Sequence, residues 1–185
     1  TIITSMYQEH GVTPSPKMAG LMAAAILSDT VMFKSPTCTK KDIAMAERLA
    51  RIARISLKDL GRELFSSTSD GKSAEELLGT DYKEFHISGQ TIGVGQITCV
   101  DSSKLVERRD EFIAAMEKVK QNSNCDLVIL MITDVLLDGS HIFYVGSDDV
   151  MQEAFSTVPK DKHMFLPKVM SRKKQIIPML TAMWG

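Results

Sequence analysis

The sequence predicts an α/β fold in which several helices are followed by a mixed β-sheet with flanking helices. Up to about residue 65, apolar side chains recur with the period of a helix. From Glu84 onward segments of strand length begin, and the run 126–133 has the length and apolar composition of a central strand covered on both faces. At 185 residues the chain can bury a substantial core, in one large or two small domains.

Four helices are expected in the first part of the chain, and their ends carry recognisable signals. Gly11 is typical of a residue that ends a helix, whereas Ser15 and Pro16 are typical of an N-cap and a first turn. Thr39 is placed to cap the third helix, and the apolar second helix is expected to be buried on nearly all sides. The expected spans are Thr1 to His10, Met18 to Leu27, Lys40 to Arg54 and Ser56 to Phe65.

The turn-forming stretch Ser66 to Gly71 is expected to separate two domains, which gives domains at 1–66 and 73–185 and a linker at 67–72. Ser73 and Glu76 form a capping-box pattern at the start of the next helix. A β-hairpin is expected around Gly89, and the glycines of its second strand predict a close backbone approach or a bulge. The further expected elements are the helices 73–79, 103–121, 149–155 and 175–183 and the strands 84–88, 91–97, 126–133, 140–145 and 164–170.

Composition and charge exclude several classes of protein. The formal net charge of −1 does not fit general nucleic-acid binding, which needs a broad basic face. No apolar run approaches the length that spans a membrane. The cysteines Cys38, Cys99 and Cys125 are far apart and odd in number, which favours reduced thiols and a cytoplasmic location. The histidines are isolated in the sequence and lack the spacing of metal ligands.

The stretch Ser171 to Gln175 places consecutive cations between two apolar segments. Such a turn must reach the surface where one element ends and the next begins. Arginine presents a planar fork for phosphate oxygens and lysine adds a mobile charge, so the turn is a candidate phosphate clamp. A solvated basic turn without a ligand is the other reading, and the residues alone leave both open.

Asp29 is a second candidate, because it is expected at the C-terminal end of the second helix. The helix macrodipole favours cations at that end, so a carboxylate there needs another partner. A metal ion or a hydrogen-bond network is one explanation, and a local turn-forming aspartate is the other. Oxygen ligands of this kind suit manganese and magnesium.

Four blocks of the sequence together resemble one known family. They are Ser28 to Thr39, Asp81 to Phe85, Ile132 to Asp134 and Ser171 to Gln175, and they span nearly the whole chain in that family's order. The family is that of the family II, manganese-dependent inorganic pyrophosphatases, in the DHH phosphoesterase superfamily. The resemblance implies that residues 1–66 are the C-terminal part of the metal-binding DHH domain and that residues 73–185 are the DHH-associated substrate-binding domain.

The resemblance also implies roles for single residues. Asp29 aligns with a ligand of the paired catalytic metals, which are manganese or cobalt with magnesium assisting. Lys83, Arg172 and Lys173 align with cations that bind the phosphates of the substrate, whereas Lys174 has no assigned role. The implied reaction is the hydrolysis of pyrophosphate to two phosphates by a metal-activated water, in a cleft that the two domains close about the linker.

By the same resemblance the chain is part of a longer enzyme. The DHH triplet and the family's other metal ligands have no counterpart in this sequence, so no catalytic residue is assigned here and the chain is expected to be inactive alone. The intact enzyme is expected to be a homodimer without nucleic-acid or membrane partners. Two alternatives remain open: a related exopolyphosphatase or phosphoesterase of the DHH superfamily, and a non-catalytic anion-binding regulatory module.

Overall fold

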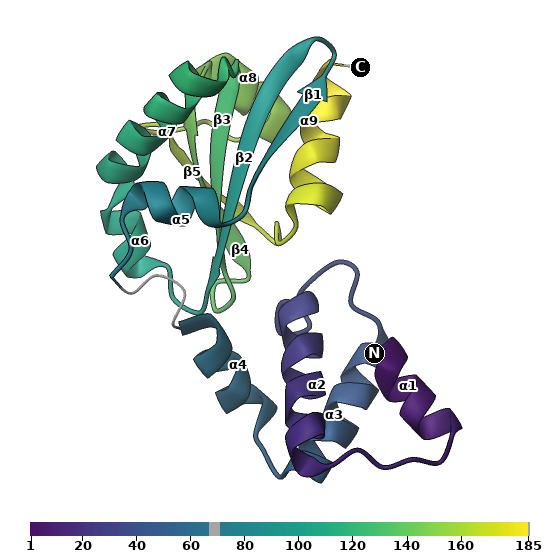
Figure 1. The fold of residues 1–185 in the computed structure, drawn as a ribbon. Helices are drawn as coiled ribbons and strands as arrows, with labels where there is room; N and C mark the ends of the chain where they lie inside the picture. The colour runs from purple at the N-terminus through teal and green to yellow at the C-terminus, as the bar shows by residue number, and fades with distance from the viewer. Residues whose placement is uncertain (67–70, 185) are drawn as a thin grey trace. The chain divides into compact units, whose positions relative to one another are not determined.

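A computed structural model describes residues 1–66 and 71–184 of the chain. The chain divides into two compact units, Thr1–Ser67 and Thr68–Gly185 (Figure 1). The first unit is helical and the second is a five-stranded sheet with helices, so the expected mixed α/β class is confirmed. Most of the expected linker, from residue 67 to residue 70, lies outside the described residues.

The helices of the first unit begin where the sequence signals predict. The Ser15 hydroxyl accepts a hydrogen bond from the Met18 amide at 3.3 Å, and Thr39 and Asp42 form a reciprocal capping box. Leu21 is 69% exposed, so the expectation of a second helix buried on nearly all sides is wrong. The helices are α1 (Ile2–Glu9), α2 (Pro16–Asp29), α3 (Lys40–Ala53) and α4 (Leu57–Ser66).

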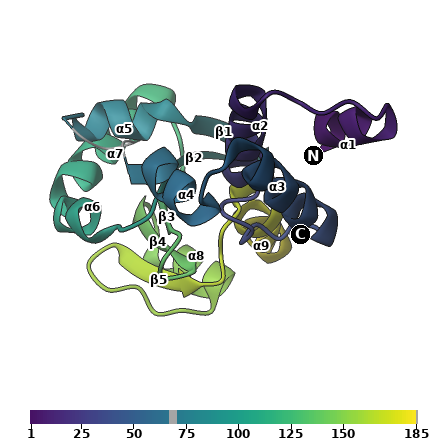
Figure 2. The ribbon, with the colours of Figure 1, turned by 90° about the horizontal axis from the view of Figure 1, so that it is seen from below.

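Helices α2 and α3 pack side by side (Figure 2). Small alanine side chains at the contact let the two backbones approach closely, and a leucine and an isoleucine fill the space between them. The buried residues of this small core are Ala19, Ala23, Ile26, Ala46 and Leu49.

The second unit is built on one mixed sheet with the strand order β1-β2-β3-β4-β5. Strands β2 and β3 are parallel, and the other neighbours are antiparallel. Ser88 and Gly89 turn the expected hairpin with φ angles of 48° and 83°, as a tight hairpin turn requires. Every residue of β3 is buried, as predicted for a central strand. The strands are β1 (Tyr82–Ile87), β2 (Gln90–Cys99), β3 (Leu127–Asp134), β4 (Gly139–Val145) and β5 (His163–Pro167).

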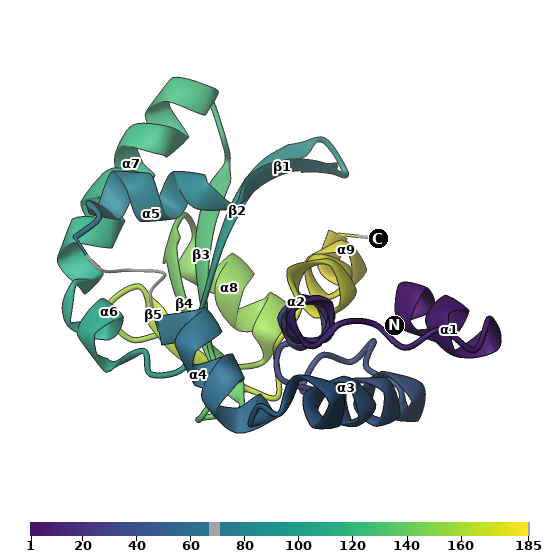
Figure 3. The ribbon, with the colours of Figure 1, turned by 60° about the horizontal axis from the view of Figure 1, so that its bottom comes forward.

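Helices cover both faces of the sheet, and Figure 3 shows the two layers. Helices α5 (Ala74–Thr80), α6 (Ser103–Glu107) and α7 (Arg109–Ser123) cover one face, whereas α8 (Asp148–Phe155) and α9 (Ile177–Trp184) cover the other. Each face has its own core, with Phe112 and Met116 on the α7 side and Tyr144 and Met151 on the α8 side. The sheet is therefore a rigid support for residues at its edges. Among the described residues, no helix has the length and apolar character needed to cross a membrane.

The expected helix 103–121 is instead two helices, α6 and α7, which meet at Arg108. Ser102 does not cap α6, because its amide and its hydroxyl both donate to Oδ2 of the buried Asp134, at 2.8 and 2.7 Å. Arg108 has φ and ψ of −86° and 16°, outside helical geometry, and its guanidinium lies over the Phe112 ring. The break allows Leu105 of α6 and Phe112 of α7 to reach the same core.

The end of the chain also differs from expectation. Strand β5 ends at Pro167 rather than at Met170, because Lys168 has a φ of 63° and its amide bonds to the Asp138 carbonyl. The basic stretch then forms a π-helical turn, η1 (Arg172–Ile176), directly before α9. The cations therefore lie in a wide turn that opens a helix, and such π turns are frequent at functional sites.

Candidate phosphate-binding site

Two side chains hold the basic turn in shape. Ser171 caps it, because its hydroxyl accepts a hydrogen bond from the Lys174 amide at 3.3 Å. Gln175 reaches back over the turn: its Oε1 accepts from the amides of Met170 and Ser171 at 2.9 and 3.0 Å, and its Nε2 donates to the Lys168 carbonyl at 2.8 Å. The turn is therefore fixed by its own sequence on both sides of the cations.

Arg172 is the buried cation of this turn, with only 6% of the residue exposed. Its Nη1 donates to the carbonyls of Asp81 and Val94 at 2.6 and 2.8 Å, and its Nη2 donates to Oδ1 of Asp81 at 2.8 Å. A buried charge is tolerated only when hydrogen bonds replace its water. Arg172 thus joins η1 to the residue before β1 and to the middle of β2.

Lys83 faces the same carboxylate from β1. Its Nζ lies 3.9 Å from Oδ1 of Asp81, the oxygen that accepts from Arg172, and 63% of its side chain is exposed. That distance is too long for a hydrogen bond, so the ammonium donors remain available to an incoming anion. The structure therefore brings together two of the predicted phosphate-binding cations, which are far apart in the sequence.

Lys173 and Lys174 are the solvent-facing cations of the turn. Both are exposed, and neither forms an ion pair with any of the residues that the structure describes. Lys173 directly follows Arg172, so it belongs to the same turn as the buried cation. The turn thus combines an anchored arginine with mobile lysines.

Asp29 belongs to the first unit, where it is the exposed last residue of α2. Within the described ranges, no hydrogen bond or ion pair engages its carboxylate, which is open to a ligand. The chain after it is unusual, because Val31, Met32 and Phe33 all have left-handed φ angles, of 49°, 51° and 68°. Thr30 supports this turn: its hydroxyl donates to the Ile26 carbonyl at 2.7 Å and accepts from the Phe33 amide at 3.2 Å.

The fit of this carboxylate to a metal is partial. An exposed aspartate oxygen is a suitable ligand for manganese. However, no group of three or more histidine, cysteine, aspartate or glutamate side chains with metal-binding geometry exists among residues 1–66 and 71–184. Asp29 can therefore serve as one ligand, and the described residues do not complete a metal centre around it.

The structure also shows a pair of histidines that sequence reasoning treated as isolated. Nδ1 of His141 on β4 lies 2.9 Å from Nε2 of His163 on β5, with the two rings stacked. Burial lowers the pKa of both imidazoles, and the pKa of His163 is lowered further by His141 and Arg109. The pairing of β4 with β5 could have predicted this histidine pair. In that pairing His141 lies opposite Phe165, which is two residues from His163.

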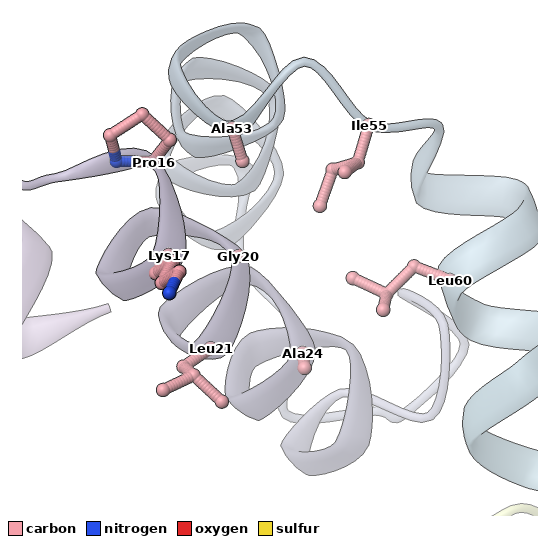
Figure 4. Close-up of a pocket in the computed structure, with 8 residues that line it drawn as sticks. All are labelled: Pro16, Lys17, Gly20, Leu21, Ala24, Ala53, Ile55 and Leu60. Atoms are coloured by element: carbon pink, nitrogen blue, oxygen red, sulfur yellow. The ribbon is translucent and has the colours of Figure 1, made fainter.

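A groove on the first unit is unsuited to phosphate. It has a volume of about 610 Å³ and lies between α2, the end of α3 and α4 (Figure 4). Its lining is apolar apart from Lys17, and no predicted site residue contributes to it. The lining residues are Pro16, Lys17, Gly20, Leu21, Ala24, Ala53, Ile55 and Leu60. A diphosphate needs several cations or amide donors, so the basic turn is the better candidate.

Comparison with known proteins places this sheet and its basic turn in a family. The family model of the DHHA2 domain matches residues 62–183, so the chain belongs to the DHHA2 domain family. The chain is 43% identical over 185 residues to the manganese-dependent inorganic pyrophosphatase of Methanothrix thermoacetophila, and the match covers 97% of this chain and 60% of that protein. It is 38% identical to the cobalt-dependent inorganic pyrophosphatase of Clostridium perfringens, with 98% of this chain and 34% of that protein covered.

A solved structure gives the same result. The crystal structure of a Methanococcus jannaschii protein, provisionally assigned to the family II inorganic pyrophosphatases, matches with a TM-score of 0.84 and 33% identity. The match covers 99% of this chain and 63% of that one. These findings confirm the resemblance to family II inorganic pyrophosphatases. The chain spans 60% of the length of the Methanothrix relative, at its C-terminal end.

Proposed function

We propose that this chain supplies the phosphate-binding part of an inorganic pyrophosphatase, which hydrolyses pyrophosphate to two phosphates. The observation that carries the proposal is that Lys83 and Arg172 face one oxygen of Asp81. The exposed Lys173 directly follows Arg172 in the same turn. The names of the relatives support the reaction, since those of Methanothrix and Clostridium perfringens are inorganic pyrophosphatases.

The cations have a clear task in this reaction. A water oxygen forms a bond to one phosphorus while the bond from that phosphorus to the bridging oxygen breaks, and negative charge grows on the departing phosphate. Fixed and mobile cations stabilise that charge. In our proposal Arg172 provides the fixed charge, and the exposed ammonium groups of Lys83 and Lys173 close on the phosphate oxygens.

Asp29 is the proposed metal ligand. A bound manganese or cobalt ion supplies a water that is acidic enough to act near neutral pH, and magnesium is proposed to assist. The open carboxylate at the end of α2 supports this role, and the manganese- and cobalt-dependent relatives support the choice of metal. Residues 1–66 are accordingly proposed to be part of a DHH domain, and residues 73–185 the substrate-binding domain. We also propose that the intact enzyme is a cytoplasmic homodimer.

The test is phosphate release from pyrophosphate with manganese. The chain is assayed alone and after addition of the part of the Methanothrix enzyme that it does not match. We expect no turnover alone and turnover in the mixture. Turnover by the chain alone would contradict the assignment of Asp29 as one ligand of a metal centre completed by the added part. No phosphate release in either assay would contradict the proposed reaction.

Two substitutions sharpen the test. Arg172→Ala should reduce turnover of the mixture far more than Lys174→Ala, because only Arg172 is anchored to β1 and β2. Equal losses would refute the assignment of roles within the turn.

Tripolyphosphate as a competing substrate tests the alternative function. An exopolyphosphatase should prefer tripolyphosphate to the shorter pyrophosphate. A non-catalytic regulatory module should show no turnover of either substrate.

A further inference from the structure

We propose that Asp81 is a positioning residue, which holds Lys83 and Arg172 toward a common anion. The inference rests on the proposed function, because it concerns the same phosphate site. It assigns a role to a carboxylate at a place where the expected ligand is itself negatively charged. The reason for a negative side chain at this position must therefore lie in the cations beside it.

The geometry singles out one oxygen. Oδ1 of Asp81 accepts from Nη2 of Arg172 at 2.8 Å and lies 3.9 Å from Nζ of Lys83. The Asp81 carbonyl accepts from Nη1 of the same arginine at 2.6 Å and from the Gln96 amide at 3.1 Å. Asp81 is thus fixed at the end of α5 by its backbone, while its side chain faces both cations.

The charge of Asp81 has two consequences for the site. Two cations directed at one point repel each other, and a carboxylate between them offsets that repulsion before an anion arrives. A lysine side chain also loses conformational freedom when it binds a ligand, and a nearby carboxylate reduces that loss by keeping it close to its bound position. Both effects act through Lys83, because its side chain is exposed and Asp81 is its one ion-pair partner among residues 1–66 and 71–184.

Arg172 depends on Asp81 in a different way. The guanidinium has five N–H donors, and three of them bond to Asp81 and Val94. The remaining two are Nε–H and one Nη2–H, which bond to no acceptor in the described part of the chain. The contact with Asp81 fixes the guanidinium so that these two donors have one orientation, while the donors of Lys83 can adjust.

The experiment is calorimetric titration of the chain with pyrophosphate. Asp81→Asn is the informative variant, because an amide oxygen still accepts from Arg172 and the backbone bonds remain, so that mainly the charge is lost. We expect about tenfold weaker binding for Asp81→Asn. Asp81→Glu keeps the charge and should recover part of the affinity. It also serves as the second variant if the asparagine protein fails to fold.

A matched control is Asp148→Asn. Asp148 also accepts from a lysine, Lys162, and from a tyrosine, but it lies on α8 and, in the part of the chain that the structure describes, bonds to none of the three predicted phosphate cations. Its loss should leave pyrophosphate binding unchanged. Equal weakening by the two variants would show a general effect of charge or stability and would overturn the positioning role.

A double-mutant cycle separates positioning from a purely structural effect. If Asp81 acts through Lys83, then Asp81→Asn should have little further effect in a Lys83→Ala protein. A full tenfold effect in that background would overturn the positioning of Lys83.

If the unaltered chain binds pyrophosphate and Asp81→Asn binds equally well, the positioning role is wrong and the proposed function stands. If the unaltered chain does not bind pyrophosphate, the proposed function fails and the positioning role with it.

Discussion

The two edges of the sheet bury basic side chains in different states: one edge holds a charged arginine, and the other holds a histidine pair that needs at least one neutral ring. At the β1 edge, Arg172 is buried with its charge, because two carbonyls and a carboxylate of fixed position accept its hydrogen bonds. At the β5 edge, His141 and His163 face each other at 2.9 Å, and the Phe165 ring packs against His141. A neutral imidazole can donate to another, but two imidazolium ions cannot form this contact.

The comparison shows which edge can carry a permanent charge for binding. A guanidinium stays protonated throughout the range in which proteins are stable, so a buried arginine is a cation that does not depend on pH. The histidine pair keeps its geometry only while at least one ring is neutral, so the β5 edge depends on pH. An anion site that must work near neutral pH therefore fits the β1 edge.

The largest effect should come from Arg172→Ala. The substitution removes a buried side chain and leaves the carbonyls of Asp81 and Val94 without these donors. We expect the free energy of unfolding to fall by about 3 kcal/mol. Urea denaturation followed by circular dichroism measures this change.

Lys174→Ala is the control for that experiment. Lys174 lies in the same turn, but it is exposed, so its removal should change the free energy of unfolding by less than about 0.5 kcal/mol. If the two variants unfold at the same urea concentration, the buried hydrogen bonds of Arg172 do not stabilise the β1 edge and the comparison of edges fails.

A smaller effect is expected from Gly93→Ala on β2. A Cβ at this position would lie 1.8 Å from the hydroxyl of Tyr82, whose ring crosses the strand there. The ring must move, which breaks its contact with Sγ of Cys125 at 3.6 Å, and we expect a loss of about 1–3 kcal/mol in unfolding free energy. Thermal denaturation of the purified chain measures the loss.

Gly79→Ala is the matched control in the same unit. No atom lies within 4 Å of a Cβ at Gly79, and the residue belongs to α5, so alanine should be neutral or stabilising by up to about 1 kcal/mol. A comparable loss in both variants would mean that the crossing of Tyr82 over β2 does not constrain the β1 edge.

Local signals in the sequence predicted most elements of the fold. The caps at Ser15, Thr39 and Ser73, the hairpin at Gly89 and the buried strand β3 all follow from residues close together in the chain. The glycines of β2 were expected to mark a close backbone approach or a bulge, and the packing of the Tyr82 ring against Gly93 confirms the close approach. These features depend on backbone preferences that neighbouring residues decide.

The errors arise where distant residues decide the structure. One helix was expected over residues 103–121, but the hydroxyl of Ser102, just before it, bonds to Asp134, which the sequence places 32 residues away. The basic turn could be located from the sequence, whereas its contact with Asp81 depends on how η1 meets β1. The same reason explains why the histidine pair was missed. The roles of Asp29 and of the cations stay predictions.

The smallest expected effect is the pH dependence of the β5 edge. The pKa values of His141 and His163 are lowered in the folded protein, chiefly by burial, while the charge of Asp134 opposes the shift at His141. An unfolded histidine has a pKa of about 6.5, so the unfolded state binds protons first as the pH falls. The pair therefore contributes its full stability above about pH 6.5 and loses it as the pH falls through the lowered values.

Urea midpoints at about pH 7.5 and 5.5 measure this loss, in a range where carboxylates stay largely ionised. The exposed His86 provides the control, so His86→Gln should keep the pH dependence of the unaltered chain. The double variant His141→Gln, His163→Gln should show a smaller difference between the two pH values, because glutamines do not titrate. If the double variant keeps the full difference, the pH dependence has another source, and the contrast between a permanent charge at β1 and a titrating pair at β5 loses its thermodynamic basis.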